Sequence, residues 1–512
     1  MLSRLLGFVR QILIAGVIGA GGNPVADAFW AAFRLPNMFR RLFAEGAFHA
    51  AFIPMFQARS IQSRDDARRF AEDVMAGLIF ILTLLTIIVE IFAPAFVWLL
   101  ASGFEVDPDK FALTTLYTRI MFPYLAFMSI VGLLSGILNS FNRFTASAGA
   151  PLLLNICLIS GVLLFAKSGV EVTGMAAAWA VFIGGILQLL LLVWGAARQN
   201  FTLKLRRPRL TPDVKRLLIL GTPGFISAGA LQINLIIGTN IASQQPGAVS
   251  WLMNADALYQ LPLAVIGIAL GSVLLPNLSR AVKSENPQDA RRMLNRAVEV
   301  AVFFCLPAAA AFLVMAAPIC DALYRGLAGE ALGLFGVNGS AFNIDDVAKT
   351  GSALALFGIG LPAFVLLKVF SPAFFAREDT RTPMVYALIA IFVNTVLALA
   401  LFPKLGFLAV ALSTSIAAWF QVTLLAQKLW RVDYFQPDLR LISRIGRIMI
   451  ASALMAYALT LLLPYREQAA SFFLGRDWLG IVMIALAGLL VYGILSLLTG
   501  AARPREWFSR AS

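Results

Sequence analysis

Long apolar runs separated by short polar segments recur along the whole chain of 512 residues. Each run approaches the roughly 20 residues that an α-helix needs to cross the hydrocarbon core of a bilayer. The runs do not alternate with a period of two, as the strands of a membrane barrel would, and unpaired backbone in lipid is costly. The pattern therefore predicts an all-α polytopic membrane protein with about fourteen transmembrane helices. They are expected near 1–20, 25–55, 70–100, 112–140, 146–166, 172–197, 213–243, 248–277, 292–316, 351–375, 383–402, 406–429, 446–464 and 477–499.

Composition supports this class, because 60% of the residues are hydrophobic, 13% are charged and the mean hydropathy is +0.83. The net charge is +14, and most Lys and Arg residues fall in the loops after even-numbered spans and at the C-terminus. The positive-inside rule then predicts that both termini are cytoplasmic. Basic loops of this kind face anionic membrane lipids, so we expect no nucleic acid partner.

Two parts of the chain look related, with a nearly constant offset between matching features. Ala26-Asp27-Ala28 corresponds to Ala255-Asp256-Ala257, and Phe122-Pro123 corresponds to Leu361-Pro362. We expect two pseudo-symmetric six-helix lobes, 1–197 and 213–430, around a central cationic cavity near the midplane. Chance coincidence of prolines is the alternative. A basic cytoplasmic linker, 198–216, joins the lobes, and two extra helices in 440–500 lie outside the duplication.

Charged residues are unusually frequent in the first two predicted spans, where each costs about 2.5–3.5 kcal/mol on insertion scales. Asp27, Arg34 and Arg41 are spaced by seven and share one helix face, and Glu45 follows four residues later. Arginine binds phosphate oxygens in a bidentate manner and keeps its proton, so the cluster suits a diphosphate. Salt bridges between the two helices, or snorkelling to the surface, are the alternatives. The candidate substrate-binding residues of this region are Arg4, Arg10, Asp27, Arg34, Arg40, Arg41 and Glu45.

Ser250 and Asp256 in the eighth span are further candidates for lining the site, although Asp256 also suits helix pairing. Asn155, Asn234, Asn240 and Asn394 suit interhelical hydrogen bonds, and a monovalent cation site among them stays open.

Catalytic patterns are missing from the sequence. A single histidine and three scattered cysteines argue against a zinc site or a histidine-based triad. No Walker sequence occurs, so uphill movement would draw on an ion gradient, the membrane potential or substrate consumption. We expect a transporter that is not an enzyme and has no cofactor. A membrane glycosyltransferase would need a large catalytic outer loop, whereas the longest one here, 317–350, has few titratable groups.

Several stretches resemble the MurJ/MviN family of lipid II flippases. They are Ser3-Arg4-Leu5-Leu6-Gly7-Phe8-Val9-Arg10, Ala26-Asp27-Ala28-Phe29, Phe33-Arg34-Leu35-Pro36-Asn37, residues 40–48, Ser250-Trp251, Ala255-Asp256, residues 267–276 and residues 368–377. The resemblance covers nearly the whole chain. It implies the fold of the multidrug/oligosaccharidyl-lipid/polysaccharide exporter superfamily, with two lobes and two C-terminal helices that form a groove for the lipid tail.

The resemblance also implies a function. The substrate would be lipid II, an undecaprenyl-diphosphate-linked disaccharide pentapeptide, moved from the inner to the outer leaflet of the bacterial inner membrane by alternating access. Arg4, Arg10 and Arg40 would be cavity cations, Asp27 and Glu45 their acidic partners, and Ser250 a lining residue. We expect a monomer that associates with the cell-wall synthesis machinery. Export of another polyprenyl-diphosphate-linked glycan or of an amphipathic drug is the alternative.

Two positions depart from the family pattern. Ala257 stands where the family usually has an Arg, which would weaken the diphosphate clamp unless Arg34 or Arg41 substitutes. Gln11 stands where an Asp is usual, which would leave Arg10 freer to meet phosphate.

Overall fold

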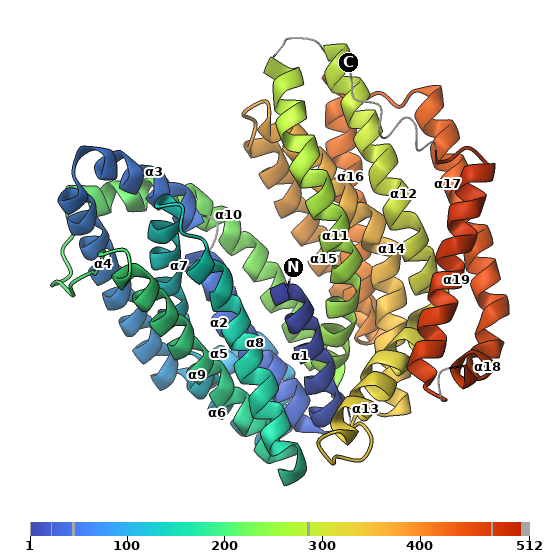
Figure 1. The fold of residues 1–512 in the computed structure, drawn as a ribbon, viewed down its shortest axis with the longest axis horizontal. Helices are drawn as coiled ribbons and strands as arrows, with labels where there is room; N and C mark the ends of the chain where they lie inside the picture. Colours follow the sequence, from blue (N-terminus) through green and yellow to red (C-terminus); the bar gives the residue numbers. More distant parts are fainter. Residues whose placement is uncertain (1, 22, 44–46, 284–286, 473–474, 503–512) are drawn as a thin grey trace. The chain divides into compact units, whose positions relative to one another are not determined.

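The computed structural model describes residues 2–21, 23–43, 47–283, 287–472 and 475–502, and within these ranges all regular secondary structure is helical (Figure 1). The chain divides into two compact units. Unit 1 comprises Met1–Ser250 and Ala328–Phe342, and unit 2 comprises Trp251–Leu327 and Asn343–Ser512. The boundary differs from that of the predicted lobes, which stay a prediction.

The helices of unit 1 are α1 (Leu2–Ile18), α2 (Pro24–Phe43), α3 (Ala47–Gln62), α4 (Arg64–Ile91), α5 (Ala93–Ala101), η1 (Ser102–Val106), α6 (Pro108–Met121), α7 (Tyr124–Ser140), α8 (Thr145–Phe165), η2 (Ala166–Ser168), α9 (Val170–Ala197), α10 (Pro212–Ser243) and α13 (Ala328–Gly333). Helix α11 (Ala248–Lys283) begins in unit 1 and continues in unit 2. Unit 2 also contains α12 (Pro287–Cys320), η3 (Asp321–Leu327), α14 (Ile344–Phe375), α15 (Arg381–Leu405), α16 (Leu408–Arg431), α17 (Leu439–Leu462), η4 (Leu463–Tyr465), α18 (Arg466–Ser471) and α19 (Asp477–Leu498).

Ten helical stretches of the described chain are long and apolar enough to cross a membrane. They confirm a polytopic all-α membrane protein. The four predicted spans outside this set correspond to α1, α2 with α3, α10 and α11. Helix α1 has 17 residues, and α2 carries Asp27, Arg34, Arg40 and Arg41. The total of fourteen is consistent with the structure but stays a prediction.

Three predicted spans are each formed by a pair of helices, and one of them, span 70–100, is α4 followed by α5. Span 112–140 is α6 followed by α7, with the break at Phe122-Pro123, because Pro123 has no N–H to donate to the helix. Span 25–55 corresponds to α2 and α3, which lie on either side of residues 44–46. In unit 1, α3 packs against α4, α7 and α10 (Figure 1).

The segment predicted as the longest outer loop, 317–350, is largely helical, which corrects that expectation. It contains the end of α12, then η3, α13 and the start of α14. Residues 328–342 belong to unit 1 because they pack on the end of α1. The Ala341 N–H donates to the Gly16 carbonyl over 2.7 Å, and a methyl group at Gly16 would lie only 2.7 Å from Cβ of Ala328.

The basic linker is fixed to unit 1 by side chains of α3 and α4. Phe201 is fully buried, with its ring 5.8 Å from Phe56. Arg68 donates to the Asn200 carbonyl over 2.9 Å. Buried Glu72 accepts from the Lys204 N–H over 3.0 Å and pairs with Arg206 over 2.6 Å. The linker is therefore an ordered part of unit 1.

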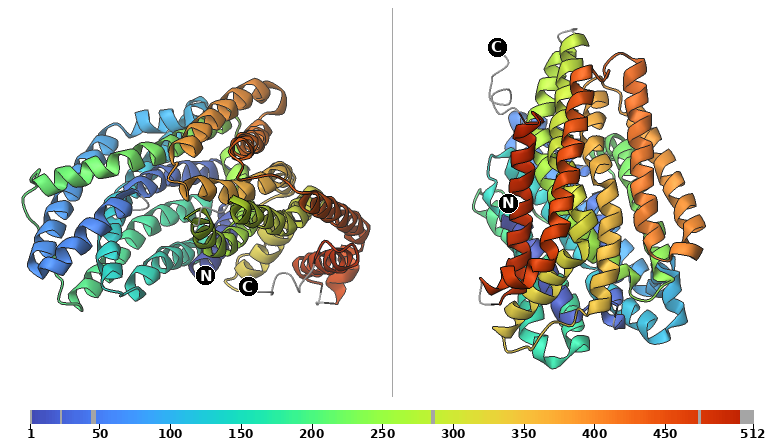
Figure 2. Two further views of the ribbon diagram at one scale, coloured as in Figure 1. Left: turned by 90° about the horizontal axis from the view of Figure 1, so that it is seen from above. Right: turned by 90° about the vertical axis from the view of Figure 1, so that its right-hand side faces the viewer.

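In unit 2, α17 and α19 lie on one side of α12 and α14, and α15 and α16 lie on the other (Figure 2). One face of α12 contacts the C-terminal helices over several turns. Asn295 donates to the Gln436 carbonyl over 2.8 Å, buried Glu299 pairs with buried Arg444, and the Phe303 carbonyl accepts from the Tyr492 hydroxyl over 2.7 Å. Arg444 falls between the predicted spans 406–429 and 446–464, and the structure corrects this by placing it in α17.

Candidate functional site

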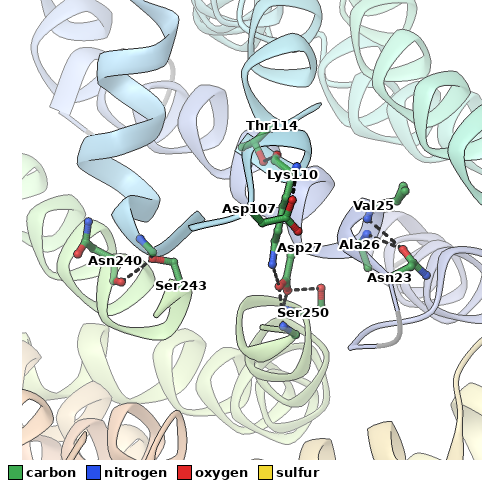
Figure 3. A network of polar contacts seen from close by, with 12 residues as sticks. Asn23, Val25, Ala26, Asp27, Asp107, Lys110, Thr114, Asn240, Ser243 and Ser250 are labelled. Atoms are coloured by element: carbon green, nitrogen blue, oxygen red, sulfur yellow. Dashed lines mark hydrogen bonds and ion pairs between the residues drawn. The ribbon is translucent and has the colours of Figure 1, made fainter. Parts of the chain in front are cut away.

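The Asp27 carboxylate near the start of α2 accepts hydrogen bonds at both of its oxygens (Figure 3). It is 1% exposed. Its Oδ2 lies 2.5 Å from Nζ of Lys110 and accepts from the Gly247 N–H over 2.7 Å. Its Oδ1 accepts from the N–H and the hydroxyl of Ser250, over 2.9 and 2.8 Å. Both oxygens are therefore saturated by unit 1 itself.

The bonding partners explain why a charge is stable here. Gly247 directly precedes α11 and Ser250 is its third residue, and in this first turn the backbone N–H groups have no acceptor within the helix. A carboxylate at a helix N-terminus satisfies those donors and interacts favourably with the helix dipole. Asp27 thus joins α2, α6 and the N-terminus of α11. Substrate contact by Asp27 stays a prediction.

The predicted span 112–140 leaves Lys110 outside the helix, whereas the structure buries it in the first turn of α6, at 5% exposure. Its ammonium also lies 4.1 Å from the ring centroid of Phe104. The Asp107 side chain accepts from the Lys110 N–H over 3.1 Å and caps the helix, and Pro108 occupies its first position. This capping sequence was the signal that α6 begins before Lys110.

Arg10 on α1 is half-buried and is bonded to an amide. Its Nη1 donates to Oδ1 of Asn155 on α8 over 3.0 Å, and Nδ2 of Asn155 donates to the Ser3 carbonyl over 3.1 Å. The guanidinium lies 5.9 Å from the ring centroid of Phe33 on α2. Its Nε is buried without a hydrogen-bond partner among the described residues. Arg40 lies close enough for its positive charge to act on Arg10.

The other predicted cations of the first two spans occupy different surroundings. Arg4 is exposed on α1. Arg34 is half-buried and donates to the Thr239 hydroxyl on α10. Arg40 is half-buried and donates from Nε to Oδ1 of Asn37 over 3.3 Å. Arg41 lies in α2 but its side chain is outside the described part, and Glu45 lies outside the described residues.

The two candidates of the eighth span lie in different units. Ser250 is fully buried against Asp27 in unit 1. Asp256 is half-buried in unit 2, where it accepts from Nε2 of Gln260 one turn later on α11. Unit 1 therefore brings Asp27 close to Ser250, and Arg10 close to Arg40. That all of the candidate residues together form one substrate-binding site stays a prediction.

The described residues contain no group of three or more His, Cys, Asp or Glu side chains arranged to hold a metal ion. Two of the amides considered for a cation have protein partners: Asn155 as above, and Asn240, which donates to the Trp98 and Leu99 carbonyls over 3.3 and 3.1 Å.

Comparison with known proteins gives consistent results. The family described as "Lipid II flippase MurJ" matches residues 14–476. A "Probable lipid II flippase MurJ" of Rhizobium meliloti (strain 1021) is 48% identical over 465 residues, which cover 89% of this chain and 83% of the relative. A "Lipid II flippase MurJ" of Burkholderia cenocepacia is 34% identical, over 89% of this chain and 87% of the relative.

Among solved structures, "Lipid II flippase MurJ, inward closed conformation" has a TM-score of 0.79 and 25% identity, over 97% of this chain and 96% of that chain. An inward-facing multidrug resistance MATE family transporter has a TM-score of 0.64 at 16% identity, over 87% of this chain and 95% of that chain. The second likeness concerns the fold alone.

Proposed function

The chain belongs to the MurJ family of lipid II flippases, and on that premise we propose that it moves lipid II across the membrane for peptidoglycan synthesis. Lipid II carries a diphosphate between its polyprenyl tail and its glycopeptide. Moving the diphosphate through a bilayer requires cations that replace its hydration, and arginine suits this because it stays charged and donates to two oxygens at once.

The surroundings of Arg10 carry this proposal. Its guanidinium is half-buried, it makes no ion pair with a carboxylate among the described residues, and the charge of Arg40 acts on it. A buried cation beside a second cation is costly unless an anion is bound. Asn155 occupies one nitrogen and Nε has no described partner. An anion that reaches this face gains a charged donor that the protein leaves partly unsatisfied.

The hydrogen bonds of Asp27 hold in place the helix that carries Arg34 and Arg40. Asp27 lies two helical turns before Arg34 on α2, and it ties α2 to α6 and to the N-terminus of α11. Because α2 carries both Arg34 and Arg40, this anchoring fixes the positions of the two arginines relative to α6 and to the N-terminus of α11. We propose that Asp27 and Ser250 act in transport through this positioning, and that Arg4, Arg10, Arg34 and Arg40 bind the substrate.

The membrane arrangement follows from the same premise. The chain is a multi-pass membrane protein, and we propose that it lies in the bacterial inner membrane with both termini in the cytoplasm. We further propose that it works as a monomer, that α17 and α19 hold the lipid tail, and that an ion gradient or the membrane potential drives transport. A coupled monovalent cation and association with the cell-wall machinery belong to this proposal.

Rescue of bacteria depleted of their own lipid II flippase tests the function. The chain should restore growth and prevent the accumulation of lipid II. Arg10→Ala should fail at equal protein level, whereas Arg119→Ala, which removes an arginine bonded to the Glu90 carbonyl on α4, should rescue. Comparison with Ala257→Arg shows whether the missing family arginine limits transport. Lack of rescue by the well-expressed chain would point to another polyprenyl-linked glycan or a drug as the cargo.

A further inference from the structure

A cavity of about 800 Å³ lies in unit 1 between α8 and α9. The two helices are adjacent in sequence and lie side by side (Figure 1), and both belong to stretches long enough to span a membrane. The cavity volume is within the range of binding sites for drug-sized ligands. None of the predicted diphosphate-binding residues lines it.

The shape of this cavity follows from residue size. Its floor consists of small residues, Gly161 on α8 and Ala176 and Ala180 on α9, and the helices approach closely there. A methyl group at Gly161 would lie 3.0 Å from Cβ of Ala180 and 3.3 Å from the Ala176 carbonyl oxygen. Large exposed side chains, Leu164 and Trp179, rise beside the floor. Small residues at the contact and large ones beside it leave a groove along the helix pair.

The length of the groove fits one hydrocarbon chain. From Val172 to Ile183 on α9, eleven steps between consecutive residues at a rise of 1.5 Å each give about 16 Å. This is about half of the roughly 30 Å hydrocarbon core of a bilayer, so the groove has the depth of one leaflet. Its lining is almost entirely apolar apart from Ser160 and Glu171, which suits an acyl chain and disfavours a polar ligand.

Glu171 lies at the end of the groove, in the first turn of α9, and is exposed. A carboxylate in a first turn is favourable by itself because of the helix dipole. At the end of an apolar groove, this carboxylate can also select the headgroup of a bound lipid. It accepts hydrogen bonds from a primary ammonium and repels an anionic headgroup. A quaternary ammonium has no N–H to donate.

We propose that the α8–α9 groove, lined by Gly161, Leu164, Glu171, Ala176, Trp179 and Ala180, binds one acyl chain of a phospholipid whose headgroup carries a primary ammonium. The acyl chain lies over the small floor residues, and the ammonium donates to the Glu171 carboxylate. The groove is separate from the Arg10 and Asp27 clusters, so the inference does not depend on the transported substrate.

The chain supplies its own reporter. Cys157 lines the groove and is half-exposed, whereas Cys305 and Cys320 are fully buried. Alkylation of the purified protein in detergent by a maleimide, followed by mass spectrometry, reports on Cys157 in the folded protein. Reaction at Cys305 or Cys320 reports unfolding. A lipid in the groove should slow the reaction of Cys157.

The experiment measures the rate of Cys157 alkylation at increasing concentrations of dioleoylphosphatidylethanolamine or of dioleoylphosphatidylcholine. The ethanolamine lipid should protect Cys157 at a concentration about two- to fivefold lower, the size of one exposed charge pair. Glu171→Gln should make the two lipids equal. Asp109→Asn is the matched control, because it also removes an exposed acid from the first turn of a helix, α6. This variant should still be protected at a lower concentration of the ethanolamine lipid than of the choline lipid.

Ala176→Leu, which fills the floor, should abolish protection by both lipids while Cys305 and Cys320 stay unreactive. Equal protection by the two lipids in the unmodified chain, or a preference that survives Glu171→Gln, would overturn headgroup recognition. Absence of protection by either lipid would overturn the site itself.

Discussion

Nζ of Lys110 on α6 lies 2.5 Å from Oδ2 of Asp27 on α2, and both side chains are almost fully buried. The two residues are 83 positions apart in the chain. Removal of one partner from a buried pair leaves an uncompensated charge and typically costs about 3–5 kcal/mol, whereas removal of both is much milder. The pair is therefore expected to hold unit 1 together.

This relationship gives the first prediction. Asp27→Asn and Lys110→Met should each lower the melting temperature of the purified protein, and the double variant should recover part of the loss. Thermal unfolding in detergent measures this. Lys404→Met is the control, because Lys404 is exposed in the last turn of α15. Additive losses in the double variant would show that the two charges do not depend on each other.

A second prediction concerns Glu299 on α12 and Arg444 on α17. Their buried ion pair, with the Asn295 contact to the Gln436 carbonyl, holds the α16–α17 connection against α12. Glu299→Gln should therefore make trypsin cleave faster at Arg431 and Arg440, which flank this connection. Gel analysis of a digestion time course measures the rate.

The control for this prediction is Glu330→Gln on α13 of unit 1, which leaves the α16–α17 connection intact. The exchanged pair, Glu299→Arg with Arg444→Glu, should restore part of the protection. A cleavage rate unchanged by Glu299→Gln would show that the ion pair contributes nothing to the docking of α17.

The linker supplies a third prediction. Phe201 is fully buried between Phe56 and Phe141, so Phe201→Ala should cost about 3–5 kcal/mol locally and release the linker from α3 and α4. Hydrogen exchange of the 198–211 peptides should rise by more than tenfold, while that of α12 should not change. Leu205→Ala, at an exposed position of the same linker, should have no effect. Equal exchange in both variants would contradict an ordered linker.

Hydropathy predicted most of the fold because the cost of inserting a helix in lipid is a local property of each segment. The buried ion pairs between helices were not predicted. Lys110 and Arg444 looked like loop cations, yet each is buried against an acid that is distant in sequence, Asp27 and Glu299. Such pairs depend on which helices pack together, and no local pattern contains that information.

For the candidate site, the sequence likewise predicted the charged residues but not the partners that bind them. The cationic character of α1 and α2 follows directly from Arg10, Arg34 and Arg40 in apolar surroundings. The sequence did not indicate that Asn155 holds Arg10 or that the N-terminus of α11 meets Asp27. Both contacts join residues more than 100 positions apart, and they decide which charges are already satisfied.

The most direct test of the central claim is lipid II translocation by the purified protein in proteoliposomes. Fluorescent lipid II reports movement by becoming accessible to a quencher on the opposite side. A lost hydrogen bond to a charged group costs about 1.5–3 kcal/mol, so Arg10→Gln should reduce the rate about 10- to 100-fold. Arg119→Gln should leave it unchanged. Equal rates for Arg10→Gln and the unmodified chain would contradict a diphosphate clamp at Arg10.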